Sequence, residues 1–240
     1  MDSLALLHAG KMPERYLRNQ GTIGVAGQEK LCRSRIAVIG AGGLGGLVIE
    51  LLARLGVGFL RVVDGDVFAR HNWNRQLLAE EDNLSGNKAL AAERRVAAIN
   101  SEVVVEACAL MLDEENAASL LDGVELVVDA LDSIPTRLIL ARAAKKKGIP
   151  LVHAAIAGYT GQVMTVFPDD PGLERLYERP VTRGVEVELG NLSPTPAIAA
   201  ALQVQEVVKV ITGRGEPLRN KLLYFDAEWN LFEIMEVAKR

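Results

Sequence analysis

Short hydrophobic runs alternate with longer amphipathic segments along the first two thirds of the chain. The runs are rich in valine, isoleucine and leucine, and the first two end at Gly40 and Asp64, whereas the segments between the runs are rich in alanine and charged residues. This alternation is typical of buried parallel strands joined by crossover helices. The pattern predicts strands over 35–40, 59–64, 103–107, 126–130 and 150–155, and helices over 42–54, 88–100 and 136–147.

The pattern changes after residue 160. A strand is predicted over 162–167, and the proline- and glycine-containing stretch 168–194 reads as a crossover loop. Thr195 and Pro196 then suit the N-cap and first turn of a helix that runs to Gly213. The runs 221–226 and 231–237 predict a closing antiparallel hairpin. The expected fold class is α/β: a three-layer, doubly wound, Rossmann-like and mostly parallel sheet that continues into antiparallel C-terminal strands.

Composition narrows the class without naming a function. The 240 residues are 49% hydrophobic and 24% charged with a net charge of −4, which is ordinary for a globular domain and offers no basic stripe for nucleic acid. The most apolar helical segment contains Glu50 and Arg54, and the N-terminus lacks a signal sequence, so we expect a cytoplasmic protein without a membrane partner. Cys32 and Cys108 are too few for a disulfide scaffold.

A glycine-rich loop lies between the first predicted strand and the first predicted helix. Residues 40–45 read Gly-Ala-Gly-Gly-Leu-Gly, so Gly40, Gly42, Gly43, Leu44 and Gly45 are candidate nucleotide-binding residues. Glycines let backbone N–H groups approach phosphates, and the helix N-terminus adds partial positive charge. The loop alone does not separate NAD, FAD and ATP.

Charged residues beyond the loop favour a triphosphate. Asp64 ends the second predicted strand, where an acid typically binds the ribose hydroxyls. Arg75 and Lys88 follow, and such side chains bind phosphate oxygens and stabilise the charge that develops at an attacked phosphate. Asp132, after the fourth predicted strand, is a candidate Mg²⁺ ligand. Together these residues predict an ATP site rather than an NAD site.

Motifs along nearly the whole chain resemble the ThiF/MoeB/HesA family, which is related to the ubiquitin-activating enzymes. The resemblance rests on a set of short segments: Arg15-Tyr16-Leu17-Arg18, Gly27-Gln28, the glycine loop, Gly56-Val57-Gly58, Asp64-Gly65-Asp66, Asn72 with Arg75-Gln76, Lys88, Ala130-Leu131-Asp132-Ser133 with Arg137, and Gly161-Gln162.

The resemblance implies roles for these residues. Asp64 holds the ribose, Asp132 binds Mg²⁺, and Arg18 reaches the ATP of the neighbouring subunit of a homodimer. The triphosphate is arranged by Asp66, Asn72, Arg75, Gln76 and Lys88. The implied reaction is attack of a carboxylate on the ATP α-phosphate to give an acyl-adenylate and pyrophosphate. The implied substrate is the C-terminal Gly-Gly of a ubiquitin-like sulfur-carrier protein of the MoaD or ThiS type, which serves molybdopterin, thiamine or related biosynthesis.

The chain departs from many relatives in its cysteines. It has no Cys-x-x-Cys pair, so no zinc of the family's structural type is expected. Residues 109–240 contain no cysteine, which excludes covalent transfer of the carrier through the crossover loop. His153 ends an apolar strand and has two interpretations, a packed core residue or a residue of the substrate channel.

A single domain over 1–240 is expected, with N-terminal helices over 1–34, a Rossmann-like ATP-binding half over 35–160, and an exit strand, crossover loop, helix and hairpin over 161–240. Three alternative functions stay open. One is an enzyme that adenylates a non-protein carboxylate, such as a tRNA threonylcarbamoyladenosine dehydratase. The others are a non-catalytic nucleotide-binding protein and a dinucleotide oxidoreductase.

Overall fold

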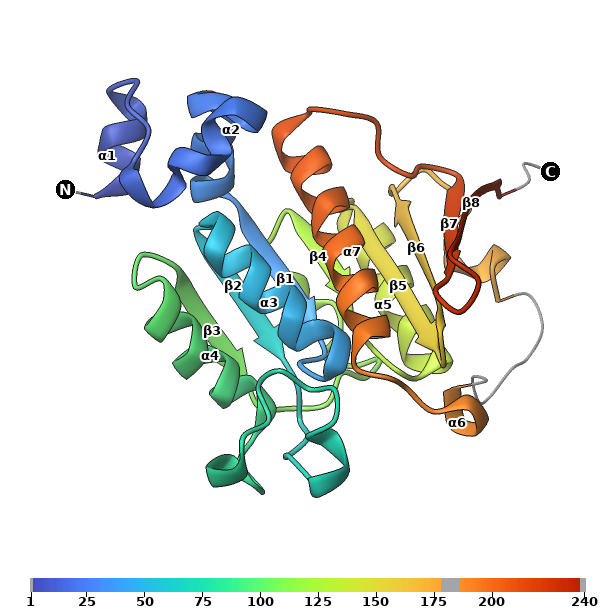
Figure 1. Cartoon of the computed structure of the whole chain (residues 1–240). Coiled ribbons are helices and arrows are strands. Elements are labelled where there is room, and N and C mark those ends of the chain that lie inside the picture. The colour runs from blue at the N-terminus through green and yellow to red at the C-terminus, as the bar shows by residue number, and fades with distance from the viewer. Residues whose placement is uncertain (1, 178–185, 238–240) are drawn as a thin grey trace.

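A single eight-stranded sheet organises the chain (Figure 1). The computed structural model describes residues 2–177 and 186–237. The strand order is β3-β2-β1-β4-β5-β6-β7-β8. The strands are β1 (Arg35–Ile39), β2 (Phe59–Val63), β3 (Val104–Cys108), β4 (Leu126–Asp129), β5 (Leu151–Ala157), β6 (Thr160–Val166), β7 (Lys221–Asp226) and β8 (Leu231–Glu236).

Strand direction divides the sheet in two. Strands β3, β2, β1, β4 and β5 pair in parallel, with Val38 opposite Val62 on one side and Val128 on the other. Strands β6, β7 and β8 continue the sheet in antiparallel pairing. The predicted fold class is therefore confirmed. The order reverses between β1 and β4, and the space outside the carboxyl ends of strands at such a reversal is where open α/β sheets bind ligands.

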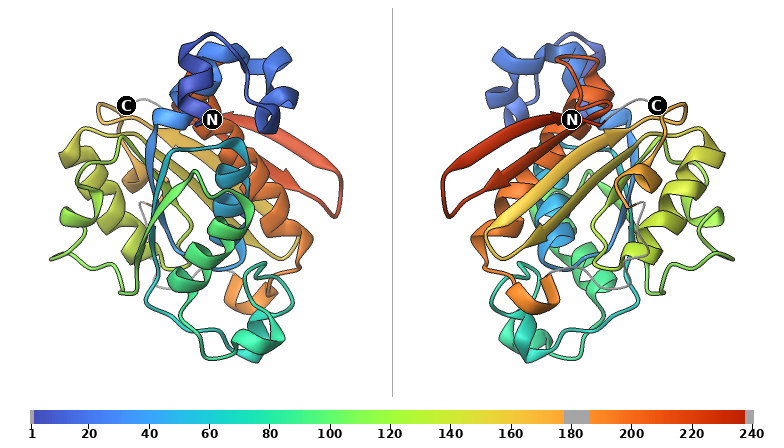
Figure 2. Two further views of the ribbon diagram at one scale, coloured as in Figure 1. Left: turned by 90° about the vertical axis from the view of Figure 1, so that its left-hand side faces the viewer. Right: turned by 90° about the vertical axis from the view of Figure 1, so that its right-hand side faces the viewer.

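Helices cover both faces of the sheet (Figure 2). Apolar side chains of α3 (Gly43–Leu55), α4 (Lys88–Ile99) and α7 (Pro194–Thr212) form one core with the strands, while α5 (Ile134–Lys147) belongs to a second core on the other face. The three layers arise because the central strands are buried on both faces. The hairpin of β7 and β8 projects from the body of the molecule, and β8 is exposed along its whole length.

Three helices precede the sheet: α1 (Ser3–His8), the 3-10 helix η1 (Glu14–Asn19) and α2 (Gln20–Arg33). Tyr16 of η1 is fully buried, and its hydroxyl accepts a hydrogen bond of 2.9 Å from Asn100. Gly56 ends α3 with φ +80°, and a Cβ at that position would lie 2.3 Å from the Tyr16 hydroxyl. The buried Tyr16 hydroxyl thus occupies the space that a side chain at position 56 would need, so only glycine fits there. These two segments support the fold rather than the cavity.

Several elements differ from the sequence-based expectation. Helix α7 begins two residues early, with Ser193 as its N-cap and Pro194 in its first turn, so the assignment to Thr195 and Pro196 was wrong. Thr195 instead donates a hydrogen bond of 2.7 Å to the Gly158 carbonyl. The crossover stretch also contains η5 (Leu173–Arg175) and α6 (Glu186–Leu189). Residues 178–185 lie outside the described part. No helix among the described residues is long and apolar enough to cross a membrane.

Candidate active site

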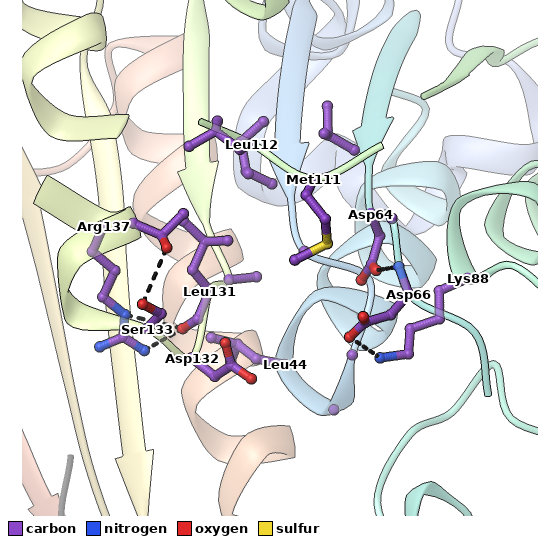
Figure 3. A pocket seen from close by; sticks show the side chains of 18 of the residues that line it. Leu44, Asp64, Asp66, Lys88, Met111, Leu112, Leu131, Asp132, Ser133 and Arg137 are labelled. Atoms are coloured by element: carbon purple, nitrogen blue, oxygen red, sulfur yellow. Dashed lines mark hydrogen bonds and ion pairs between the residues drawn. The ribbon is translucent and has the colours of Figure 1, made fainter. Parts of the chain in front are cut away.

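A cavity of about 510 Å³ opens at the carboxyl ends of the parallel strands, on both sides of the β1–β4 reversal. The loops after β1, β2 and β4 and the first turns of α3, α4 and α5 line it. In Figure 3, Asp64, Asp66 and Lys88 lie on one side, and Asp132, Ser133 and Arg137 lie opposite them. The doubly wound topology therefore brings together charged groups that are far apart in the sequence.

The glycine loop forms the floor of this cavity. Helix α3 begins after Gly42, and no side chain caps its N-terminus, so the first backbone N–H groups are available to a phosphate. A Cβ on Gly45 would lie 1.9 Å from the Gly40 carbonyl oxygen, so only glycine permits this tight turn. Gly40, Gly42, Gly43 and Leu44 line the cavity, whereas Gly45 does not.

Asp64, at the end of β2, connects the glycine loop to the loop that follows β2. Its carboxylate accepts hydrogen bonds from the backbone of Ala41 at 2.7 Å and of Asp66 at 2.8 Å. Burial raises the pKa of Asp64, and the two backbone hydrogen bonds and the charge of Lys88 oppose that shift. The Lys88 ammonium is buried and lies 3.0 Å from the exposed Asp66 carboxylate. Lys88 can donate three hydrogen bonds, so this ion pair leaves donors for a phosphate.

The loop between β2 and α4 (the arm) supplies Arg75 and Gln76. Arg75 lines the cavity, and its guanidinium donates to the His71 carbonyl and to Asn74. Gln76 is buried with its side-chain oxygen unpaired, and it lies against the glycine loop. Asn72 is buried and does not line the cavity. Its side chain accepts from the Ala69 backbone and so closes the short helix η2 (Arg70–Asn72), which carries the chain toward Arg75.

Asp132 follows β4 on the opposite side of the cavity. Its side chain is exposed to the cavity and forms no hydrogen bond or ion pair with any described residue. Behind it, the Leu131 N–H donates to Asp129 at 3.0 Å, and Arg137 donates to the Leu131 carbonyl. A free carboxylate held on a braced loop beside a phosphate-binding turn has the chemistry of a Mg²⁺ ligand.

Ten of the twelve candidates expected around a nucleotide in the same chain lie together at this cavity. Gly45 and Asn72 do not line it and instead shape the turn before α3 and the helix η2. Arg18 is exposed on η1 between α1 and α2. Those helices lie at the edge where the parallel strands begin, opposite the carboxyl ends that form the cavity (Figure 1). Arg18 therefore does not reach the cavity of its own chain.

Four further lining residues carry no motif in the sequence. Leu110, Met111 and Leu112 form an apolar wall after β3, and Met111 lies above the cavity in Figure 3. Asn191 approaches from the end of the crossover stretch, where its carbonyl accepts from Asn74. Nothing in the local sequence marks Asn191, because only the return of the chain to the sheet brings it here. His153 is fully buried and does not line the cavity.

The geometry agrees with a comparison against protein families. The model of the ThiF family matches residues 16–240. The chain belongs to the ThiF family. The resemblance deduced from the short motifs is thereby confirmed, including the segments around Tyr16 and Gly56 that build the scaffold rather than the cavity.

Curated relatives are similar over most of the chain. It is 37% identical over 225 residues to the SAMP-activating enzyme E1 of Haloferax volcanii, an alignment that covers 92% of this chain and 83% of the relative. It is 38% identical over 225 residues to the sulfur carrier protein adenylyltransferase of Thermus thermophilus, covering 89% and 83%. It is 38% identical over 208 residues to the sulfur carrier protein ThiS adenylyltransferase of Bacillus subtilis, covering 84% and 62%.

Solved structures share the architecture. The crystal structure of PaaA superposes with a TM-score of 0.80 at 26% identity, covering 95% of this chain and 74% of that one. The structure of E. coli MccB with ATP superposes with a TM-score of 0.83 at 22% identity, covering 95% and 72%. At that identity the likeness to MccB concerns the fold.

Proposed function

We propose that this chain uses ATP to adenylate the C-terminal glycine carboxylate of a ubiquitin-like sulfur-carrier protein. The observation that carries the proposal is the convergence of Arg75, Lys88 and Asp132 around an uncapped helix N-terminus at the β1–β4 reversal. Two relatives that are named sulfur carrier adenylyltransferases support the choice of a carrier as substrate.

The reaction requires charge neutralisation more than proton transfer. A carboxylate is already ionised near pH 7, so it attacks the α-phosphate without a general base. The α-phosphate gains negative charge during attack, and the N–H groups of α3 with Arg75 and Lys88 stabilise that charge. Asp64 binds the ribose through the lone pairs that its two backbone hydrogen bonds leave available.

Asp132 would hold Mg²⁺ together with the triphosphate. Mg²⁺ in nucleotide sites commonly takes one or two protein carboxylates and completes its coordination with phosphate oxygens and water. The exposed and unpaired Asp132 carboxylate fits that requirement. Bound Mg²⁺ would supply a Lewis acid that draws charge from the phosphates.

A homodimer would complete each site. Arg18 lies at the edge of the sheet opposite the cavity, so it contributes only to the cavity of a second copy. Mixing Arg18→Ala with Lys88→Met tests this arrangement, because half of the sites in mixed dimers would hold neither substitution. Recovery of activity on mixing is expected. No recovery, with mixed dimers shown to form, would contradict the arrangement.

The carrier is not held covalently in this scheme. Residues 109–240 contain no cysteine, so we expect the acyl-adenylate to be attacked by a separate sulfur donor. The end of the crossover stretch at Asn191 and the turn at Gly158 are bridged to each other beside the cavity. This side of the cavity is a suitable entry for a flexible Gly-Gly tail.

Pyrophosphate exchange tests the proposal. Labelled pyrophosphate should enter ATP only when a carrier ending in Gly-Gly is present, and a carrier lacking the final glycine is the matched control. Exchange without any carrier would favour the alternative, an enzyme that adenylates a non-protein carboxylate. No exchange with any Gly-Gly carrier would overturn the proposal.

A further inference from the structure

A closed ring of hydrogen bonds lies behind the Asp132 loop. Asp129 accepts from the Leu131 N–H through Oδ1, and its Oδ2 lies 2.7 Å from His153 Nδ1. His153 Nε2 lies 3.2 Å from the Tyr177 hydroxyl, which is 3.1 Å from Arg137 Nη1. Arg137 closes the ring because its Nε and Nη2 donate to the Leu131 carbonyl.

The protons of the ring have one consistent arrangement. Asp129 is assigned as the acceptor on both oxygens, so His153 donates to it from Nδ1. Burial lowers the pKa of His153, which leaves its imidazole neutral and its Nε2 an acceptor for the Tyr177 hydroxyl. The Tyr177 oxygen then accepts from Arg137 and from Gln162, which is 3.2 Å away. Tyr177 thus uses both of its lone pairs and its proton.

The ring meets the cavity at Leu131 and Arg137. It holds the N–H of Leu131 on one side and its carbonyl on the other, so the backbone immediately before Asp132 has little freedom to rotate. Asp129 and His153 are themselves fully buried and do not line the cavity. They act on the Asp132 loop only through the ring.

Tyr177 is the one ring member on the crossover segment; the others lie on β4, β5 and α5 or in the turn after β4. The segment is anchored just before it. Leu173 is fully buried, and Leu173 and Leu176 belong to the same apolar cluster as Leu140 of α5 and Leu222 of β7. The position of the Tyr177 hydroxyl therefore depends on how Leu173 and Leu176, the apolar anchor of the segment, pack in this cluster.

We propose that Tyr177 is a positioning residue that couples the packing of the crossover segment at η5 to the geometry of the Asp132 loop. Whatever shifts the segment at η5 then changes how well Asp132 receives Mg²⁺ with ATP. This inference rests on the metal role proposed for Asp132, and it does not require the substrate to be a sulfur carrier.

Direct binding of a non-hydrolysable ATP analogue tests the inference. Calorimetric titration of the full-length protein with Mg²⁺ and with EDTA gives the factor by which Mg²⁺ tightens binding. Tyr177→Phe removes the hydroxyl and keeps the packing of the aromatic side chain. The factor by which Mg²⁺ tightens binding should therefore fall about three- to tenfold, while affinity in EDTA stays unchanged. Tyr224→Phe is the matched control, since Tyr224 is a half-buried tyrosine on β7 whose hydroxyl bonds to no described residue.

A second variant tests the coupling to the segment. Leu173→Ala loosens the anchor without removing any member of the hydrogen-bonded ring, and it should lower the Mg²⁺ factor as well. The double variant Leu173→Ala/Tyr177→Phe should lose no more of that factor than Tyr177→Phe alone. Thermal unfolding checks that each variant is folded.

A Mg²⁺ factor in Tyr177→Phe equal to that of wild type, or additive losses in the double variant, would overturn the inference. A wild-type protein without any Mg²⁺ factor would overturn the Asp132 role together with it. Failure of carrier-dependent exchange alone would leave the inference standing and refute only the carrier.

Discussion

Asp129 and His153 form a fully buried pair in which the carboxylate Oδ2 lies 2.7 Å from the imidazole Nδ1. Burial lowers the pKa of His153, and the neighbouring Asp129 opposes that shift without reversing it. Neither residue lines the nucleotide cavity, but Ala130, which follows Asp129, does. It links the strand core to the loop that carries Asp132, so the stability of the core and the geometry of the site depend on the same contact.

The buried imidazole should make stability depend on pH. Because the folded-state pKa of His153 is below 6.5, the unfolded chain takes up a proton that the folded chain does not, and stability is lost as pH falls from about 6.5 through the folded value. Denaturant unfolding should show a slope of up to about 1.4 kcal/mol per pH unit from this residue. His153→Gln should flatten the slope, whereas His71→Gln, at an exposed position, should keep it. Equal slopes in wild type and His153→Gln would contradict the assignment.

Lys88→Met should remove activity without unfolding the protein. The ammonium is the buried cation beside the glycine loop, and methionine has a similar volume. Loss of a positioned charge at the attacked phosphate should lower carrier-dependent pyrophosphate exchange about 10²- to 10³-fold. Lys146→Met, on the exposed end of α5, is the control and should be as active as wild type. An active Lys88→Met variant would rule out a role at the phosphate.

Asp132→Asn should separate metal binding from nucleotide binding. The amide keeps the shape of the side chain and loses the charge that Mg²⁺ requires. Exchange should disappear at millimolar Mg²⁺, while affinity for ATP in EDTA should match that of wild type. Asp82→Asn, at an exposed position on the arm, should behave as wild type. Retained exchange in Asp132→Asn would refute the metal role.

Gly45→Ala should destabilise the glycine loop itself. The added Cβ would lie 1.9 Å from the Gly40 carbonyl oxygen, so the turn before α3 cannot keep its shape. We expect a lower unfolding temperature and no detectable ATP binding. Gly21→Ala is the control: its Cβ meets nothing within 4 Å and it lies in α2, so it should raise stability by up to about 1 kcal/mol. A Gly45→Ala variant as stable as wild type would show that the loop relaxes freely.

The order of elements and the identity of the site's charged groups follow from the sequence. Strand and helix periodicity is local, and so is the chemistry of a glycine loop followed by Asp64, Arg75 and Lys88. The start of α7 does not follow from the sequence, because Ser193-Pro194 and Thr195-Pro196 carry the same capping signal and only packing chooses between them.

Tertiary structure decided which of those residues face the nucleotide and which support the site. Gly45 and Asn72 belong to the same motifs as their neighbours, yet neither of them lines the cavity. Asn191 and Tyr177 carry no local signal at all. They matter because the crossover stretch returns to the carboxyl edge of the sheet, and contacts between residues far apart in sequence depend on the path of the whole chain rather than on any segment of it.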